Sequence, residues 1–176
     1  MNTYQLEKLC RRDPTLSKVF IGVYASDKLP VHVHNVPCAL IANTDSSDKE
    51  GSHWIGIYID ENRRGDYFDS YGRKPAIEEF ENFLNDNTIQ WQYNDKRLQG
   101  SLSAVCGQFV LYFLLQRRFG FSMYSIVQKF SDTDYNRNDL TVSKYVKKRF
   151  KFLTTPNENL EFIVRQICKT FNEQIN

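Results

Sequence analysis

The residue best suited to chemistry is Cys106, which stands between a polar loop and a long apolar run. The loop, residues 99–105, consists mainly of small and polar side chains, and residues 109–115 are apolar enough to form a buried helix. Gly120 is a suitable end for this helix, and Cys106 then lies at its N-terminus. Free backbone N–H groups and the positive end of the helix dipole favour thiolate over thiol there. Cys106 is therefore a candidate nucleophile, provided that a base reaches it.

A base and its orienting carboxylate come from one predicted β-hairpin. Residues 53–59 alternate as a strand, residues 60–65 form a polar loop, and residues 66–69 form the return strand. A short hairpin brings the end of its second strand beside the start of its first. We therefore expect Asp69 to lie next to His53, where a carboxylate could orient an imidazole that faces the thiol.

Donors for an oxyanion are also present. Gln99 lies just before the nucleophile loop, and its side-chain amide could point toward a developing negative charge. The backbone N–H of Cys106 supplies a second donor. A cysteine paired with an imidazolium can have its pKa lowered from about 8.5 to roughly 3–4. These residues together predict nucleophilic catalysis by a thiolate.

Each of these residues alone also has an ordinary structural explanation. Cysteine is among the residue types most often buried, and a single strand histidine is unremarkable. Asp69 could serve only to form the turn before Gly72, and Gln99 could be a solvated loop residue. The occurrence of all four in one arrangement favours catalysis over the structural interpretation.

Two further groups of residues invite a functional interpretation. His32, His34 and Cys38 resemble part of a zinc site, but their spacing lacks a fourth ligand and a second pair, so we predict no metal site. Residues 139–152 form a predicted helix whose basic cluster is either a solvated face or a DNA-binding surface. This basic cluster consists of Lys144, Lys147, Lys148, Arg149 and Lys151.

The elements that must position these residues mix strands and helices. Strands are predicted over residues 19–24, 38–42, 53–59, 66–69 and 89–93. Helices are predicted over residues 2–11, 75–86, 106–118, 122–130 and 139–152, and from Thr155, with Cys168 on the apolar face of the last. The expected fold class is α+β: a mixed, mostly antiparallel sheet with flanking helices and a central buried helix headed by Cys106.

Length and composition bound the class of protein. The chain has 176 residues, 41% of them hydrophobic, so we expect a single domain over residues 1–176. A net charge of +2 is too small to name a partner. Four cysteines without a CxxC pair favour a reducing compartment over a disulfide framework. We see no signal peptide and no apolar run of membrane-spanning length, so we expect a soluble, intracellular monomer that is neither secreted nor membrane-bound.

Four short motifs resemble the adenain family, the maturation cysteine proteases of adenoviruses, which have relatives in virophages and Polinton-type elements. The motifs are His53-Trp54, Phe68-Asp69-Ser70-Tyr71-Gly72, Gln99-Gly100 and Cys106-Gly107, in the order of the family. The step of seven residues from the glutamine to the cysteine also matches. In the SUMO-protease branch of the same clan this loop is one residue shorter. The resemblance covers roughly residues 1–120.

This resemblance implies an adenain/Ulp1-like cysteine protease fold and a role for each residue of the predicted site. Cys106 would be the nucleophile, His53 the general base and acid, and Asp69 the orienting carboxylate. Gln99 would be an oxyanion donor.

The same resemblance implies how substrates are bound and what they are. It assigns substrate binding to Trp54 and Gly107, with Trp54 also shielding the ion pair. The implied substrates are viral capsid-associated precursor proteins, cleaved beside small residues such as Gly. Cleavage would take place in the virion and the interior of the host cell during particle maturation.

Two departures from the adenovirus enzymes bear on this interpretation. Asp69 stands where those enzymes typically have Glu, although Asp has the same role elsewhere in the clan. Those enzymes also use a viral peptide cofactor, disulfide-linked to a cysteine before the glutamine loop, and this chain has no cysteine between Cys38 and Cys106. We therefore expect no disulfide-linked peptide. The sequence requires no cofactor, and DNA or a viral peptide bound without a disulfide stays open.

Two alternative functions stay open from the sequence. One is a SUMO- or ubiquitin-like deconjugating protease of the same clan. The other is a catalytically inactive relative that binds DNA or capsid protein.

Overall fold

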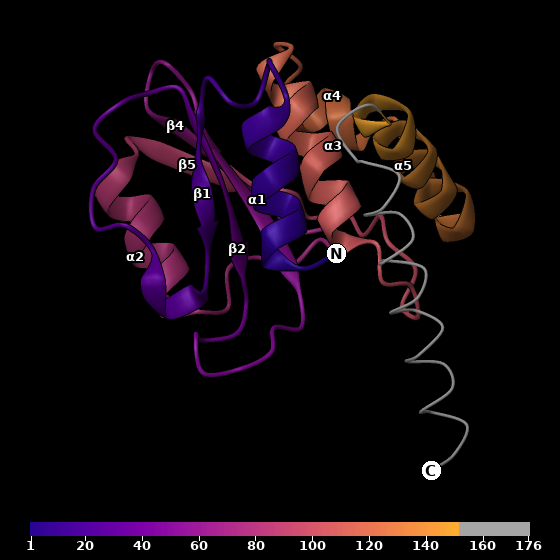
Figure 1. Ribbon diagram of the computed structural model, residues 1–176, viewed down its shortest axis with the longest axis horizontal. Helices are drawn as coiled ribbons and strands as arrows, with labels where there is room; N and C mark the ends of the chain where they lie inside the picture. The colour runs from indigo at the N-terminus through magenta and orange to yellow at the C-terminus, as the bar shows by residue number, and fades with distance from the viewer. Residues whose placement is uncertain (152–176) are drawn as a thin grey trace.

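Five strands form one sheet in the computed structural model of the chain, which describes residues 1–151 (Figure 1). Their order across the sheet follows their order in the sequence. The strands are β1 (Phe20–Tyr24), β2 (Cys38–Asn43), β3 (Trp54–Ile59), β4 (Arg64–Phe68) and β5 (Gln90–Tyr93). Each predicted strand is present.

The sheet is mixed, as predicted. The central pairs β2–β3 and β3–β4 are antiparallel, whereas the outer pairs β1–β2 and β4–β5 are parallel. Antiparallel pairing is therefore less dominant than we expected. Parallel neighbours need a crossover connection. Residues 25–37, which include a 3₁₀ turn η1 (Ser26–Lys28), connect the first parallel pair, and α2 (Glu78–Asn87) connects the second.

Helices cover both faces of the sheet (Figure 1). Within the described residues the α-helices are α1 (Thr3–Arg12), α2, α3 (Cys106–Arg118), α4 (Met123–Val127) and α5 (Tyr135–Phe150). One core lies between the sheet and α2. The other lies between the sheet and the helices α1 and α3, and it continues to α4 and α5, which pack against α3. Because both faces are covered, every residue of β2 and β3 is buried. No helix in residues 1–151 is long and apolar enough to cross a membrane.

The start of α1 matches its sequence signal, whereas α2 starts later than predicted. The side chains of Asn2 and Gln5 form a reciprocal capping box at the start of α1. The helix α2 begins at Glu78 rather than at Pro75, and Ile77 occupies its N-cap position. Three glutamates in the first turn of α2 suit the positive end of its dipole, so charge outweighs the proline signal.

The last two described helices also differ from the prediction. The helix α4 ends at Val127, before the predicted end at Phe130. The helix α5 begins at Tyr135, four residues before the predicted start, because the side chain of Asp134 accepts a hydrogen bond from the backbone N–H of Arg137 at 3.0 Å. The predicted helix from Thr155, with Cys168, lies outside the described residues.

The helix α3 lies against β3 and is almost entirely buried. Gly56 permits this close packing, because a Cβ atom at that position would lie 3.0 Å from Val110 Cγ1. The rings of Phe68 and Phe113 stack with their centroids 4.5 Å apart. The predicted central helix headed by Cys106 is thereby confirmed, and its packing fixes the height of Cys106 relative to the start of β3.

A buried ion pair joins β4 to the C-terminal turn of α3. Asp66 Oδ2 lies 2.5 Å from Arg117 Nε, and the side chains are 4% and 14% exposed. Gln92 on β5 donates a hydrogen bond to the other carboxylate oxygen at 2.8 Å. Burial raises the pKa of Asp66, while Arg117 and Gln92 act in the opposite direction. This pair fixes the position of β4, whose far end leads to Asp69, relative to α3.

Candidate active site

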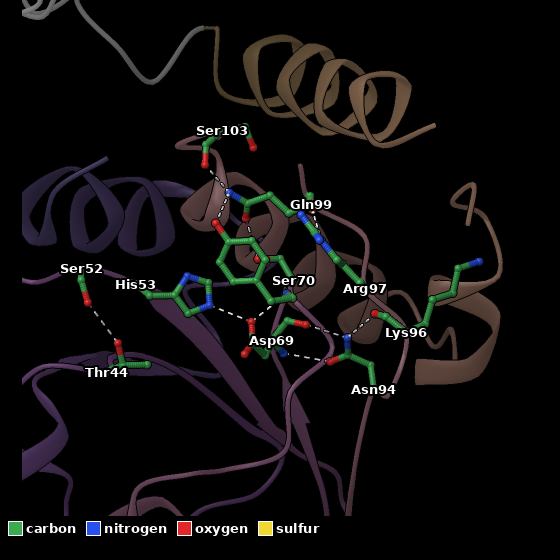
Figure 2. A network of polar contacts seen from close by, with 11 residues as sticks. Thr44, Ser52, His53, Asp69, Ser70, Asn94, Lys96, Arg97, Gln99 and Ser103 are labelled. Atoms are coloured by element: carbon green, nitrogen blue, oxygen red, sulfur yellow. Dashed lines mark hydrogen bonds and ion pairs between the residues drawn. The ribbon is translucent and has the colours of Figure 1, made fainter. Parts of the chain in front are cut away.

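The ends of the β3–β4 hairpin bring His53 and Asp69 together. His53 immediately precedes β3, and Asp69 immediately follows β4. Asp69 Oδ1 lies 2.7 Å from His53 Nε2, a contact that Figure 2 marks with a dashed line. The side chains are only 15% and 5% exposed, so water screens the contact weakly. The position that we derived from the hairpin geometry is confirmed.

Backbone contacts hold Asp69 in place. Its Oδ1 also accepts a hydrogen bond from the backbone N–H of Tyr71 at 2.8 Å. Its backbone N–H donates to Asn94 Oδ1 at 2.8 Å, and Asn94 Nδ2 donates to its carbonyl at 2.6 Å (Figure 2). Asn94 directly follows β5, so its side chain extends the pairing of β4 with β5 by one position. Sequence reasoning missed Asn94, because its partner lies 25 residues away.

Cys106 is the first residue of α3, and Val105 at the N-cap makes no side-chain cap. Burial alone raises the pKa of the Cys106 thiol. Its hydrogen bond with His53, followed by a backbone hydrogen bond at Trp54, outweighs burial, and the pKa lies below its ordinary value. These contacts favour the thiolate.

The pKa of His53 changes in the opposite direction. Burial alone lowers the pKa of the imidazole, but hydrogen bonds to Asp69 and Cys106 raise it to about 9. Since Nε2 faces Asp69, the remaining ring nitrogen, Nδ1, is the one available to Cys106. A raised imidazole pKa and a lowered thiol pKa together favour a thiolate–imidazolium pair.

The side chain of Gln99 is buried, and both the oxygen and the nitrogen of its amide group form hydrogen bonds. Its Oε1 accepts a hydrogen bond from Ser70 Oγ at 2.7 Å, and its Nε2 donates to the carbonyl of Ser103 at 2.6 Å (Figure 2). Nε2 also lies 3.4 Å from Tyr71 Oη. The backbone N–H of Gln99 donates to the carbonyl of Ser70 at 3.0 Å. The amide therefore has a fixed orientation, which suits a preorganised donor.

Trp54, the first residue of β3, and Gly107, in the first turn of α3, both pack against the start of the chain and α1. The indole N–H of Trp54 donates to the carbonyl of Met1 at 2.9 Å, and the side chain is largely buried. A Cβ atom on Gly107 would lie 3.4 Å from Leu6 Cδ2 and 3.5 Å from Trp54 Cδ1. Both residues thus have packing partners close to Cys106. Their contact with substrate stays a prediction.

The residues of the predicted basic cluster at α5 do not share one environment: one forms a buried ion pair, and the others are exposed. Arg149 forms a two-point contact with Asp13, with Nε 2.7 Å from Oδ2 and Nη2 3.2 Å from Oδ1. Asp13 is 1% exposed, so Arg149 neutralises a buried charge. The other members are exposed on the surface: Lys144, Lys147, Lys148 and Lys151. DNA contact by these lysines stays a prediction, and Arg149 is better explained as structural.

The histidines of the rejected zinc interpretation are exposed, whereas the cysteine is not. His32 and His34 lie in the segment between β1 and β2, and Cys38 is buried within β2. No group of three or more His, Cys, Asp or Glu side chains within residues 1–151 could hold a metal ion.

Comparisons with known proteins bear on the fold. No protein-family model and no curated protein sequence matches the chain. Among solved structures, the central domain of the uncharacterized Lpg1148 protein from Legionella pneumophila is similar with a TM-score of 0.50 and 14% identity, over 88% of this chain and 98% of that one. The ASFV pS273R protease is similar with a TM-score of 0.40 and 23% identity, over 58% of this chain. The chain covers 44% of the length of that protease.

Proposed function

We propose that the chain is a cysteine endopeptidase in which Cys106, His53 and Asp69 act as a catalytic triad. The observation that carries this proposal is that the three side chains meet at the start of α3. Asp69 lies 2.7 Å from His53, and the hydrogen bond between His53 and Cys106 raises the pKa of the imidazole and lowers that of the thiol. A partly buried histidine between a carboxylate and a cysteine at a helix N-terminus suits nucleophilic catalysis at neutral pH.

The geometry supports a two-step hydrolysis. The Cys106 thiolate attacks the carbonyl carbon of the scissile peptide bond, and the carbonyl oxygen becomes an oxyanion. Gln99 Nε2 and the backbone N–H of Cys106 donate hydrogen bonds to this oxyanion. The His53 imidazolium gives its Nδ1 proton to the leaving nitrogen, the C–N bond breaks, and a thioester remains.

The second step releases the enzyme. His53, now neutral, takes a proton from water, and the hydroxide attacks the thioester carbonyl. The tetrahedral intermediate collapses, the C–S bond breaks, and the acid product leaves. His53 retains the proton as the imidazolium, and Cys106 is again the thiolate. Asp69 stabilises the imidazolium before the first step and after the second.

Viral capsid-associated precursor proteins are the proposed substrates, cut beside small residues during particle maturation in the virion or the host cell. The support is the resemblance of four ordered motifs to the adenain family, including the step of seven residues from Gln99 to Cys106. A cofactor linked by a disulfide to Cys10 or Cys38 is disfavoured. Both thiols are buried, and burial raises the pKa of Cys38 to about 11 and the pKa of Cys10 further.

Thiol reactivity tests the catalytic proposal. Purified protein treated with one equivalent of iodoacetamide is expected to be alkylated at Cys106 before Cys10, Cys38 and Cys168, as measured by peptide mass mapping. His53→Ala should slow the alkylation of Cys106 at neutral pH, because the thiol loses its imidazolium partner, whereas the buried thiols of Cys10 and Cys38 should react as slowly as before. Equal alkylation of all four cysteines in the unmodified protein would indicate an inactive relative.

Cleavage assays test the substrate. The protein is incubated with capsid precursor proteins containing Gly-rich junctions and with ubiquitin-like fusions, and Cys106→Ala serves as the control. Cleavage of the precursors alone supports a maturation protease. Cleavage of the fusions alone would support the deconjugating alternative, and processing by Cys106→Ala would contradict the proposed nucleophile.

A further inference from the structure

Tyr71 contacts three of the four residues of the proposed site, each through a different group. Its backbone N–H donates to Asp69 Oδ1 at 2.8 Å. Its ring lies against the imidazole of His53, with centroids 4.9 Å apart and planes inclined by 32°. Its hydroxyl oxygen lies 3.4 Å from Gln99 Nε2. A residue that served only to turn the chain after β4 would need none of the side-chain contacts.

The hydroxyl of Tyr71 accepts the second hydrogen of the Gln99 amide. The amide group has two hydrogens, and the carbonyl of Ser103 accepts one of them at 2.6 Å. Ser70 donates to the amide oxygen at 2.7 Å, so these two contacts hold the amide at its oxygen and at one hydrogen and leave the second hydrogen for a third partner. The second hydrogen therefore points toward Tyr71 Oη. At 3.4 Å this contact is long and weak, so an oxyanion can replace Tyr71 as the acceptor.

Tyr71 itself is held by neighbours from the segment before Gln99. The guanidinium carbon of Arg97 lies 5.9 Å from the centroid of its ring, and the Nε of the same arginine donates to the carbonyl of Gln99 at 2.9 Å. Arg73 lies over the ring as well, with its guanidinium carbon at 5.2 Å. Gly72 has a φ of +69°, and a Cβ there would lie 2.5 Å from the backbone carbon of Lys96. The turn at Gly72 is thus in close contact with the backbone of the segment that leads to Gln99.

We propose that Tyr71 is a positioning residue, which aligns the Gln99 amide for the oxyanion through its hydroxyl and confines the His53 imidazole through its ring. The inference rests on the proposed function, because it gives Gln99 a catalytic task. The β3–β4 hairpin carries His53 and Asp69, and the loop before α3 carries Gln99. The side chain of Tyr71 contacts both parts of the site and would keep them aligned with each other.

Two reagents separate these two effects without knowledge of the natural substrate. Iodoacetamide alkylates a thiolate by displacement at a methylene carbon and forms no oxyanion. p-Nitrophenyl acetate acylates the same thiolate through a tetrahedral oxyanion and releases p-nitrophenolate. Both reactions need the Cys106 thiolate, but only the second needs the Gln99 amide. The ratio of the two rate constants therefore measures alignment of the oxyanion donor apart from thiolate formation.

Tyr71→Phe keeps the ring and the backbone N–H and removes only the hydroxyl. We expect its acylation rate constant to fall about tenfold, less than for loss of a direct donor, and its alkylation rate constant to stay within about twofold of the parent. Added to Gln99→Ala, the substitution should have no further effect on acylation. Tyr124→Phe, on an exposed tyrosine of α4, is the matched control and should change neither rate constant.

Tyr71→Leu removes the ring as well. We expect its acylation rate constant to fall further and its alkylation to require higher pH than in Tyr71→Phe, because water reaches the imidazole and weakens the ion pair. An alkylation–pH profile of Tyr71→Leu that matches that of Tyr71→Phe would overturn the role of the ring. Acylation by Tyr71→Phe at the parent rate, or an equal loss in the Gln99→Ala background, would overturn the role of the hydroxyl. Failure of the parent protein to alkylate preferentially at Cys106 would overturn the proposed function and this inference together.

Discussion

His53 and Cys106 change each other's protonation because they share a hydrogen bond in a partly buried site. The thiolate attracts the imidazolium, and Asp69 stabilises the same imidazolium from its other side. The charged pair is therefore expected over the pH range between the lowered pKa of the thiol and the raised pKa of the imidazole, which is about 9. Coupled groups of this kind titrate as a pair.

The pH dependence of two reactions follows from these shifts. Alkylation of Cys106 is expected to be high already at neutral pH and to fall only in acid, where the thiolate gains a proton. Peptide hydrolysis should also fall above about pH 9, because His53 then lacks the proton for the leaving nitrogen. Rate constants measured from pH 4 to pH 10 check both limbs. In His53→Ala, alkylation should rise only above about pH 8.5, the range of an ordinary thiol, because burial then raises the pKa of Cys106 without the opposing effect of His53. The same late rise in the parent protein would contradict the pairing.

The sequence predicts the triad better than its supporting contacts. His53 and Asp69 could be paired because a hairpin fixes which residues meet at its ends. Asn94, Ser70 and Tyr71 could not be assigned their roles, since these side-chain partners in the site lie 18 to 29 residues away and depend on tertiary packing. The one sign of Tyr71 in the sequence was its place in the motif Phe68-Asp69-Ser70-Tyr71-Gly72.

At the scale of elements, the site depends on how closely α3 approaches the sheet. Gly56 lies in the middle of β3, where the side chain of Val110 occupies the space that a Cβ atom would need. The residue before β3 is the proposed base, and the first residue of α3 is the proposed nucleophile. Any change in the distance between these two elements should therefore affect both stability and the His53–Cys106 contact.

Gly56→Ala tests this packing. The added methyl group would lie 3.0 Å from Val110 Cγ1 and 3.4 Å from Phe113 Cδ1, so we expect a loss of about 1–3 kcal/mol in the free energy of unfolding. Urea denaturation measures the change. Combining Gly56→Ala with Val110→Ala should cost less than the sum of the two single changes, because the second removes the atoms that the new methyl group would touch. Additive losses would show that Val110 is not the obstacle.

The ion pair between Asp66 and Arg117 gives a second prediction at this scale. Arg117→Met leaves Asp66 buried without its cation, and we expect a loss of about 3 kcal/mol at pH 7. The loss should be smaller at pH 5. Burial raises the pKa of Asp66 in the folded state, and removal of the arginine raises it further, so the folded protein then binds a proton more readily than the unfolded chain. Unfolding curves at both pH values check the sign. An equal loss at both would contradict it.

The boundaries of the elements were less predictable than their existence. Every strand could be located from its apolar pattern, but Pro75 predicted the start of α2 three residues too early and Asp134 was missed as the cap of α5. The parallel pairing of β5 with β4 could not be read from the sequence, because it depends on the path of α2 across the sheet. Local capping contacts and tertiary packing together determine where these helices begin and how the strands pair.

At the scale of the whole molecule, the exposed lysines of α5 form the basic surface that could contact DNA. Arg149 belongs to the same cluster in the sequence, but its contact with buried Asp13 joins the end of α5 to the segment after α1. The number of cations available for phosphate binding is therefore smaller than the sequence indicated.

Charge reversal tests the DNA proposal. Lys147→Glu with Lys148→Glu is expected to weaken duplex binding and to reduce the slope of log K against log salt concentration by about 0.9 for each phosphate that the protein no longer neutralises. Each single substitution, Lys147→Glu and Lys148→Glu, is also compared with Lys49→Glu, on the exposed segment before β3, so that the change of net charge is the same. Fluorescence anisotropy at several salt concentrations measures the slopes. An equal effect of Lys49→Glu would show that the α5 lysines are not a specific DNA-binding surface.

The packing of Trp54 between the start of α1 and α3 also has a spectroscopic consequence. The chain has two tryptophans, and the other, Trp91, lies on the outer strand β5 and is more exposed. The fluorescence of the more buried Trp54 should have its emission maximum at a shorter wavelength than that of Trp91. The Trp54 indole also lies next to Cys106. Covalent modification of the cysteine should therefore change the intrinsic emission of the protein, whereas Trp91→Phe should leave that change intact. The site thus contains its own optical reporter, which allows occupancy to be followed in real time without a label.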